Sequence, residues 1–285
     1  GSEMCIRDSL NEDPVKTEGG LSSGNAGESS NFLCYRALRL NYYAVTGLLA
    51  RVCLYAGQRE NAFNYSTEVI KASNNGIFPF VDRSLVNGTA QDPDRIFSPE
   101  VLFALSDSQR GELFEEYFDP SLAPNMVFRM ETDLLEQTIY GGTGTGGNLD
   151  DYRCRSNWIS SGSARYFYKY SDMTESGRIE NTMIPLLRLG EMYLIAAESQ
   201  SNSLANGVSY INTLRKNRGV SNLQTLTTTL LQYEYIREVY GEGQLFFMYK
   251  RMYSSIIRSN SATNNPAPSN AVFVVPLPDT ETENR

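Results

Sequence analysis

Three segments near the C-terminal end decide the fold: IPLLRLGEMYLIAAES at residues 184–199, YINTLRKNRG at 210–219 and YIREVYGEGQLFFMYKR at 235–251. Apolar residues recur in them at spacings of three and four, which predicts helices. The first segment is apolar on most sides, so we expect an inner helix rather than a surface helix. Together they predict a helical scaffold over residues 184–253.

The expected boundaries of the first two helices follow from single residues. Pro185 has no N–H to leave unpaired and therefore suits a first helical position, with Asn181 or Thr182 as the cap. Gly219 follows the second segment where a left-handed cap residue is expected. We expect these two helices to pack against each other.

The third helix is expected to run from about Leu230 to Arg251. Gly241 and Gly243 lie inside it, and each costs about 1 kcal/mol relative to alanine in a helix. Close approach of a neighbouring backbone is the favoured reason for them, and a helix break is the alternative.

A helical hairpin is predicted earlier, at residues 35–75. One apolar stripe contains Leu49, Val52 and Cys53, a turn is expected at Gly57, and a second helix follows. Small residues on both sides of the turn are typical of a tetratricopeptide unit, in which paired helices approach closely. Any helical hairpin needs small residues at its crossing, so a simple hairpin remains the alternative.

Six segments in series resemble the SusD/RagB family of Bacteroidetes outer-membrane nutrient-binding lipoproteins. They are LLARVCLYAGQRENAFNYSTEVIKA, EVLFALS, PLLRLGEMYLIAAES, YINTLRKNRG, REVYGEGQLFFMYKR and VFVVPLPDTETEN, and the resemblance covers roughly residues 38–284. It implies a mainly α fold, in which tetratricopeptide-like helical pairs form a superhelical scaffold with a loop-rich, aromatic insert and little β structure. It also implies an outward-facing, lipid-anchored protein of the outer membrane that delivers a glycan, or in some members a peptide, to a SusC-like TonB-dependent transporter.

The predicted organisation is a disordered leader at 1–31 followed by one SusD-like domain at 32–285. Within the domain we expect a variable insert at 107–180 and a strand or tail at 271–285. The leader is polar and rich in Gly, Ser and Asn, and it lacks the apolar stretch of a signal peptide. Cys5 lacks the small apolar run of a lipobox, so we do not expect a lipidation site there.

Composition excludes several classes of function. The net charge of -8 argues against nucleic acid as a partner, and the chain has no apolar stretch long enough to cross a membrane. The four cysteines form no C-x-x-C pair, which disfavours a zinc site; Cys53 is expected to be a buried thiol, and a Cys34–Cys154 disulfide remains open. The chain contains no histidine, which removes His-dependent catalysis.

Catalysis would therefore depend on carboxylates, and the two candidate groups have simpler interpretations. Glu112, Glu115 and Glu116 are expected on a solvated helix face, whereas a second group recurs every four residues and is expected to form a structural charge network: Glu234, Glu238 and Glu242. The GGTGTGG segment at 141–147 lacks the lysine of a phosphate loop and predicts a mobile surface loop. NLDD at 148–151 could coordinate calcium but shows no ordered ligand spacing, so it predicts a solvated loop. We expect no enzyme and no cofactor, and we assign no metal ligands, although calcium binding remains open.

The insert at 107–180 is where we expect ligand specificity, because it concentrates aromatic residues between the two helical parts. Aromatic rings stack on the C–H faces of sugars, while polar neighbours bind the hydroxyls. The candidate ligand-binding residues are Trp158, Tyr152, Asn157, Arg155, Tyr166 and Tyr168. The alternative is that the tryptophan is a core residue and that the tyrosines pack on one face of a strand.

Three functions follow from the sequence. The favoured one is a surface glycan-binding component of a transporter, which binds its ligand without turnover. The second is binding of peptides or another nutrient on the same scaffold, and the third is a helical-repeat adaptor for a protein partner.

Overall fold

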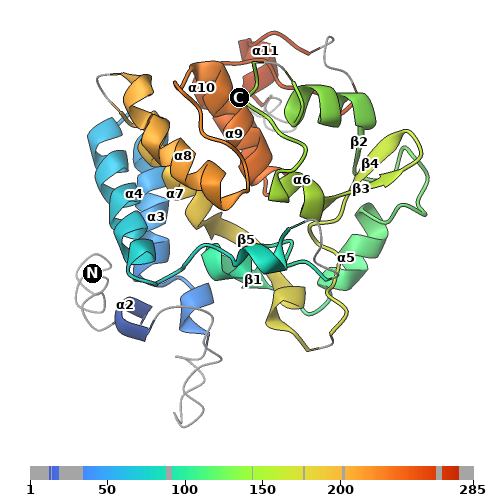
Figure 1. The fold of residues 1–285 in the computed structure, drawn as a ribbon, viewed down its shortest axis with the longest axis horizontal. Coiled ribbons are helices and arrows are strands. Elements are labelled where there is room, and N and C mark those ends of the chain that lie inside the picture. Colours follow the sequence, from blue (N-terminus) through green and yellow to red (C-terminus); the bar gives the residue numbers. More distant parts are fainter. Residues whose placement is uncertain are drawn as a thin grey trace, which may run out of the picture.

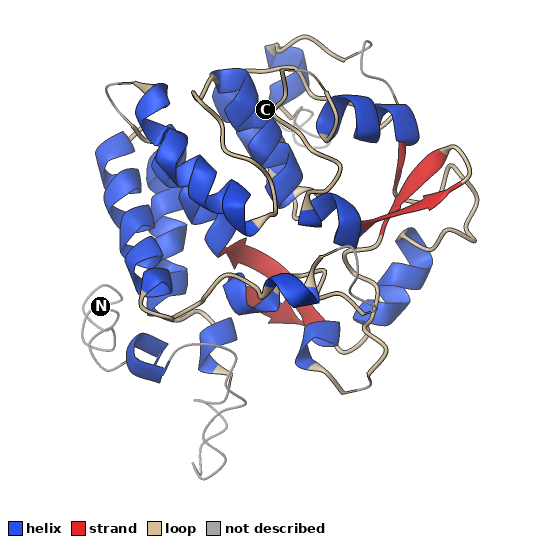
Figure 2. Ribbon diagram, in the orientation of Figure 1, coloured by secondary structure: helices blue, strands red, loops and turns tan. Residues whose placement is uncertain are grey.

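The structure of the protein is a computed structural model. It describes residues 13, 15–18, 35–87, 92–142, 144–175, 177–200, 203–260 and 265–275. Helices dominate these residues, and strands occur in two small sheets (Figure 2). The predicted mainly α fold class is confirmed. None of the helices in these ranges is long and apolar enough to span a bilayer.

The predicted hairpin forms from α3 (Tyr42–Tyr55) and α4 (Arg59–Asn74). Ala50 and Ala62 are fully buried, as the close crossing of two helices requires, and Gly57 turns the chain with a φ of 75°. Cys53 is buried, as predicted, but Leu49 and Val52 are exposed, because the buried stripe of α3 runs through its small residues instead.

A second helical pair, α7 (Leu189–Glu198) and α8 (Val208–Asn217), packs beside the hairpin although about a hundred residues separate them in sequence (Figure 1). Helix α7 is buried along its length, as expected of an inner helix, and contacts α4 on one side and α8 on the other. A Cβ on Gly207 would lie 2.4 Å from the carbonyl oxygen of Ala197, so the pair approaches too closely there for a side chain. Gly219 has a φ of 74° just beyond α8, as predicted.

The expected helix start at Pro185 is wrong. Residues Met183–Arg188 form strand β5, and the helix begins only at Leu189. Strand β5 pairs antiparallel with β1 (Val101–Ser106), from Val101 opposite Arg188 to Ser106 opposite Met183. A partner some eighty residues away therefore determines the extended conformation of this proline segment.

The pair β1–β5 lies at the two ends of the segment 107–180, and the N–H of Asp107 donates to the carbonyl of Thr182 at 2.8 Å. The segment itself contains helix α5, a π-helical turn η4, helix α6 and a three-stranded sheet of order β2-β4-β3 (Figure 1). The bounds are α5 Arg110–Tyr117, β2 Arg129–Glu131, η4 Leu134–Ile139, α6 Tyr152–Asn157, β3 Trp158–Ser161 and β4 Ala164–Phe167. Of the two tyrosines at 166 and 168 that could share one face of a strand, Tyr166 lies in β4 and Tyr168 lies just beyond its end.

The third predicted helix is broken into α9 (Thr228–Val239) and α10 (Leu245–Met252). Gly241 and Gly243 both have a φ of 74°, so the helix-break alternative is confirmed. A Cβ on Gly241 would meet the ring of Phe167 at 2.4 Å, which makes the neighbour a side chain rather than a backbone.

The termini differ from expectation where the structure describes them. In the leader, Val15–Glu18 form the helical turn α2, Val15 is buried in the core, and Asp13 accepts hydrogen bonds from Arg36. Near the other end, Asn270–Phe273 form the short helix α11 rather than a strand, while 276–285 lie outside the described residues. The remaining short helical turns are η1 Arg36–Leu38, η2 Arg83–Leu85, η3 Ser98–Glu100, η5 Ile179–Thr182 and η6 Leu204–Gly207.

Candidate functional site

A buried ion network occupies one face of α9 and joins it to the insert, to β5 and to α8. Glu238 accepts from Arg153 at 3.0 Å, from Arg188 at 2.9 Å and from Arg218 at 2.7 and 3.1 Å. Arg218 also holds Glu100 with two hydrogen bonds of 2.6 and 2.7 Å. The side chains of these residues are at most 1% exposed.

The second carboxylate of the network, Glu234, pairs with Arg153, Arg215 and Arg237. Burial alone raises the pKa of a carboxyl group, but Arg218 and Arg188 hold the pKa of Glu238 well below its usual range. Glu238 is therefore ionised and saturated with donors, as a structural group is. The predicted structural role of the glutamates on α9 agrees with these contacts, although the partners come mainly from outside α9.

The candidate ligand-binding residues of the insert do not converge on one open surface. Trp158 is 6% exposed and packs against Phe167 and Tyr240 with ring centroids 5.0 and 5.1 Å apart. Asn157 and Tyr166 are also buried, Tyr152 and Tyr168 are half-buried in two separate clusters, and Arg155 is exposed and paired with Asp150. The alternative interpretation of Trp158 as a core anchor agrees with its position.

Two loop expectations change in the structure. Asp151 in the NLDD segment is 1% exposed and caps α6 while binding Arg153, so it does not lie in a solvated loop. In the GGTGTGG segment, carbonyl oxygens of Thr145 and Gly146 accept from the buried Arg237 and Arg215 at 2.7 and 2.8 Å, which ties this loop to α9 and α8. Thr143 lies outside the described residues.

Other candidates are placed as follows. Glu112, Glu115 and Glu116 are exposed on α5, as predicted. Cys5 and Cys34 fall outside the described residues, so a Cys34–Cys154 disulfide stays untested. Within the described ranges, no group of three or more acidic or cysteine side chains could hold a metal ion.

A polar groove of about 610 Å³ lies at the base of the insert, between η1, the β1–β5 pair and η5. Tyr35, which is 41% exposed, is among the lining residues. Asp172 and Arg178 also line the groove; the side chain of Asp172 is 48% exposed and accepts from Arg110 at 3.0 Å, and Arg178 pairs with Glu180 at 2.9 Å. Three hydroxyl-bearing residues contribute to the lining: Ser106, Ser108 and Thr182.

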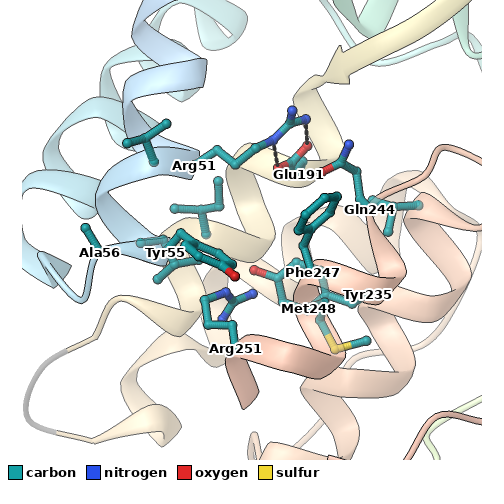
Figure 3. A pocket seen from close by; sticks show the side chains of 13 residues that line it. Arg51, Tyr55, Ala56, Glu191, Tyr235, Gln244, Phe247, Met248 and Arg251 are labelled. Carbon is teal, nitrogen blue, oxygen red and sulfur yellow. Dashed lines mark hydrogen bonds and ion pairs between the residues drawn. The ribbon is translucent and has the colours of Figure 1, made fainter. Parts of the chain in front are cut away.

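An apolar cavity of about 520 Å³ lies elsewhere, between α3, α7, α9 and α10 (Figure 3). Its walls are largely aliphatic and aromatic, and Tyr55 and Phe247 meet edge to face at 6.5 Å. Arg51 and Glu191 form a two-pronged ion pair at 2.7 Å on one wall. Arg251 and Tyr235 lie at the other end, with the guanidinium carbon 5.6 Å from the ring centroid.

Sequence reasoning missed both hollows because each is built from distant segments. The polar groove combines residues near 35, 105 and 180, and no local pattern joins them. The apolar cavity had one local signal, the stretch QLFFMYKR after the glycines, in which aromatic and basic residues share one helix. That signal says nothing about α3, which supplies the other wall.

The paired helices and the small residues at their crossings define a tetratricopeptide-like helical scaffold. A profile of the SusD family matches residues 107–272, which is more than half of the chain. The chain therefore belongs to the SusD family, and the sequence resemblance is confirmed.

Solved structures share the fold. A SusD superfamily protein from Bacteroides thetaiotaomicron has a TM-score of 0.61 and 19% identity, covering 98% of this chain and 62% of its own. A SusD-like carbohydrate binding protein from Bacteroides vulgatus has a TM-score of 0.61 and 17% identity, with coverages of 98% and 63%. A second SusD superfamily protein from Bacteroides vulgatus has a TM-score of 0.60 and 20% identity, with coverages of 98% and 61%. This chain thus spans less than two thirds of their length, and none of the curated proteins matches it.

Proposed function

We propose that this protein binds a nutrient, an oligosaccharide, without turning it over. The observation that carries the proposal is the polar groove, which an exposed tyrosine lines together with residues that bear carboxylate, guanidinium and hydroxyl groups. A sugar needs this combination, because its C–H faces stack on aromatic rings and its hydroxyls need hydrogen-bond partners. Family membership supports the proposal.

The groove also agrees with the expectation that the insert determines specificity. Asp172 and Arg178 belong to the insert, and the β1–β5 pair beneath them is anchored to the helical scaffold. Loops on a rigid frame are where binding residues gather. Of the insert residues predicted to bind ligand, Arg155, Tyr152 and Tyr168 remain accessible candidates, whereas Trp158, Asn157 and Tyr166 would bind only after rearrangement.

As part of the same proposal, the protein acts at the outer-membrane surface and delivers its ligand to a SusC-like TonB-dependent transporter, held by a lipid anchor in the full-length protein. We expect weak binding, with a Kd roughly in the μM to mM range, because a groove that is open to solvent buries only part of its ligand. Saturated carboxylates on α9 favour the non-catalytic interpretation.

A ligand panel tests the proposal. Soluble oligosaccharides are expected to raise the Tm of the 285-residue chain, whereas peptides of similar size leave it unchanged. Tyr35→Ala is expected to abolish the shift, and Tyr117→Ala, which removes an exposed aromatic ring outside the groove, serves as the matched control. A shift with peptides alone, or equal losses in both variants, contradicts glycan binding at the groove.

Tryptophan fluorescence separates the two candidate surfaces. Trp158 is buried among aromatic rings, so a sugar in the groove leaves its emission unchanged. A ligand that rearranges the insert to reach Trp158 shifts the emission. That result would move the site from the groove to the residues predicted from the sequence.

A further inference from the structure

The apolar cavity between α3, α7, α9 and α10 contains a polar group that the protein leaves unused. Tyr235 is 4% exposed and lines the cavity, yet its hydroxyl has no hydrogen-bond partner among the described residues. A buried hydroxyl without a partner is destabilising, and native structures rarely retain one without a reason. In Figure 3 this hydroxyl points into the hollow, between Tyr55 and Arg251.

The walls select an apolar ligand body. Leu54, Ile195, Val239 and Met248 line the cavity, and the rings of Tyr55 and Phe247 stand at its rim. A volume of about 520 Å³ lies within the range of small-molecule sites. The few polar groups would leave most hydroxyls of a sugar unpaired, so this cavity does not suit the ligand proposed for the polar groove.

The charges select the head group. Arg51 donates to both oxygens of Glu191 and to the carbonyl of Leu186, so this pair is saturated and forms a wall. Arg251 pairs with Glu198 through Nη1 only, and Glu198 does not line this cavity. Among the charged groups that line the cavity, Arg51 and Glu191 therefore neutralise each other and Arg251 is the remaining one, which favours an anionic head group.

We propose that this cavity is a second binding site, which takes a small amphipathic carboxylate whose apolar chain lies against α3 and α10. The carboxylate accepts a hydrogen bond from the Tyr235 hydroxyl and pairs with Arg251. The site is separate from the polar groove and does not depend on glycan binding there. An aliphatic acid of medium length fits both the volume and the single polar end.

Calorimetric titration with decanoate tests this site, with decanol and decylammonium as matched ligands that change only the head group. Decanoate is expected to bind at least tenfold more tightly than either, because only the carboxylate satisfies both Tyr235 and Arg251. Equal affinity for decylammonium, or no binding of decanoate up to its solubility limit, would overturn the proposal.

Two variants locate the ligand. Tyr235→Phe removes only the unused hydroxyl and is expected to weaken decanoate binding about three- to tenfold, whereas Tyr233→Phe, outside the cavity on the same helix, leaves it unchanged. Ala56→Trp, at an exposed position on the cavity rim, is expected to block binding. Unchanged affinity in both Tyr235→Phe and Ala56→Trp would place decanoate elsewhere and refute the site. The oligosaccharide-induced Tm shift is expected to survive in both, which keeps this test independent of the proposed function.

Discussion

Helix α9 carries two kinds of polar surface that differ in how completely their hydrogen bonds are satisfied. On one face, Glu234 and Glu238 are saturated by arginines from the insert, β5 and α8. On the neighbouring face, Tyr235 and Val239 line the apolar cavity, and the tyrosine hydroxyl has no hydrogen-bond partner among the described residues. The saturated face holds distant segments together, whereas the unsaturated face leaves binding capacity for a molecule that is not part of the chain.

The largest expected effect comes from breaking the saturated face. Glu238→Gln leaves three buried arginines with a neutral partner, and removing one member of a buried ion pair costs on the order of 3–5 kcal/mol. We expect that loss in the free energy of unfolding, measured by denaturant titration with circular dichroism. Glu115→Gln on the exposed face of α5 is the control and should cost less than about 0.5 kcal/mol. A similar small cost for both would mean that the network is not a structural tie.

The buried ion network also predicts that the stability of the protein depends on pH through the titration of Lys169. Its side chain is 2% exposed and pairs with Glu242, and burial, aided by repulsion from Arg188, lowers its pKa from 10.5 to about 8. Between these values the unfolded chain holds more protons than the folded chain, so the contribution of Lys169 to stability rises with pH in that window. In Lys169→Met the rise is absent, and the stability difference from the parent should change by on the order of 3 kcal/mol between about pH 7 and pH 10. A pH-independent difference would contradict a charged, buried lysine.

The turn between α9 and α10 contains Gly241 and Gly243. It reverses the chain so that α10 forms a wall of the apolar cavity. Gly241 and Gly243 share a φ of 74°, but only at Gly241 would a Cβ meet a ring, that of Phe167 at 2.4 Å. Alanine at Gly243 is expected to cost about 1 kcal/mol from backbone strain alone. Alanine at Gly241 should cost roughly 1–3 kcal/mol more, because the aromatic cluster must move. Equal costs in thermal unfolding would show that the ring yields freely.

Local patterns predicted the helices and missed most of the site for a physical reason. The helix pairs depend on apolar spacing and small crossing residues within one segment, and residues such as Ala50, Ala62 and Gly219 carry that information locally. The prediction of a helix start at Pro185 was wrong because pairing with β1 determines the conformation of this segment. The local sequence does not encode that pairing.

The same limit explains the candidate site. Trp158 looked like an exposed platform because its neighbours in sequence are polar, but its neighbours in space are Phe167 and Tyr240. Arg218 gave no sign that it would reach Glu100, 118 positions away. Whether a polar side chain is saturated depends on such distant partners, so the contrast between the two faces of α9 appears only in three dimensions.

The smallest expected effect is the sharpest test of that contrast, because the same substitution at two tyrosines should lower stability at one of them and not at the other. The hydroxyl of Tyr170 donates to the carbonyl of Gly241 at 2.8 Å, and Tyr170→Phe removes that hydrogen bond and should cost about 1 kcal/mol. Tyr235 is also buried but its hydroxyl has no partner among the described residues, so Tyr235→Phe should leave the free energy of unfolding unchanged or raise it by up to about 1 kcal/mol. Both variants keep the ring, so packing is matched and denaturant titration reads the hydroxyl alone. If Tyr235→Phe destabilises the ligand-free chain as much as Tyr170→Phe does, the hydroxyl of Tyr235 is already satisfied and the cavity has no polar group to offer a ligand.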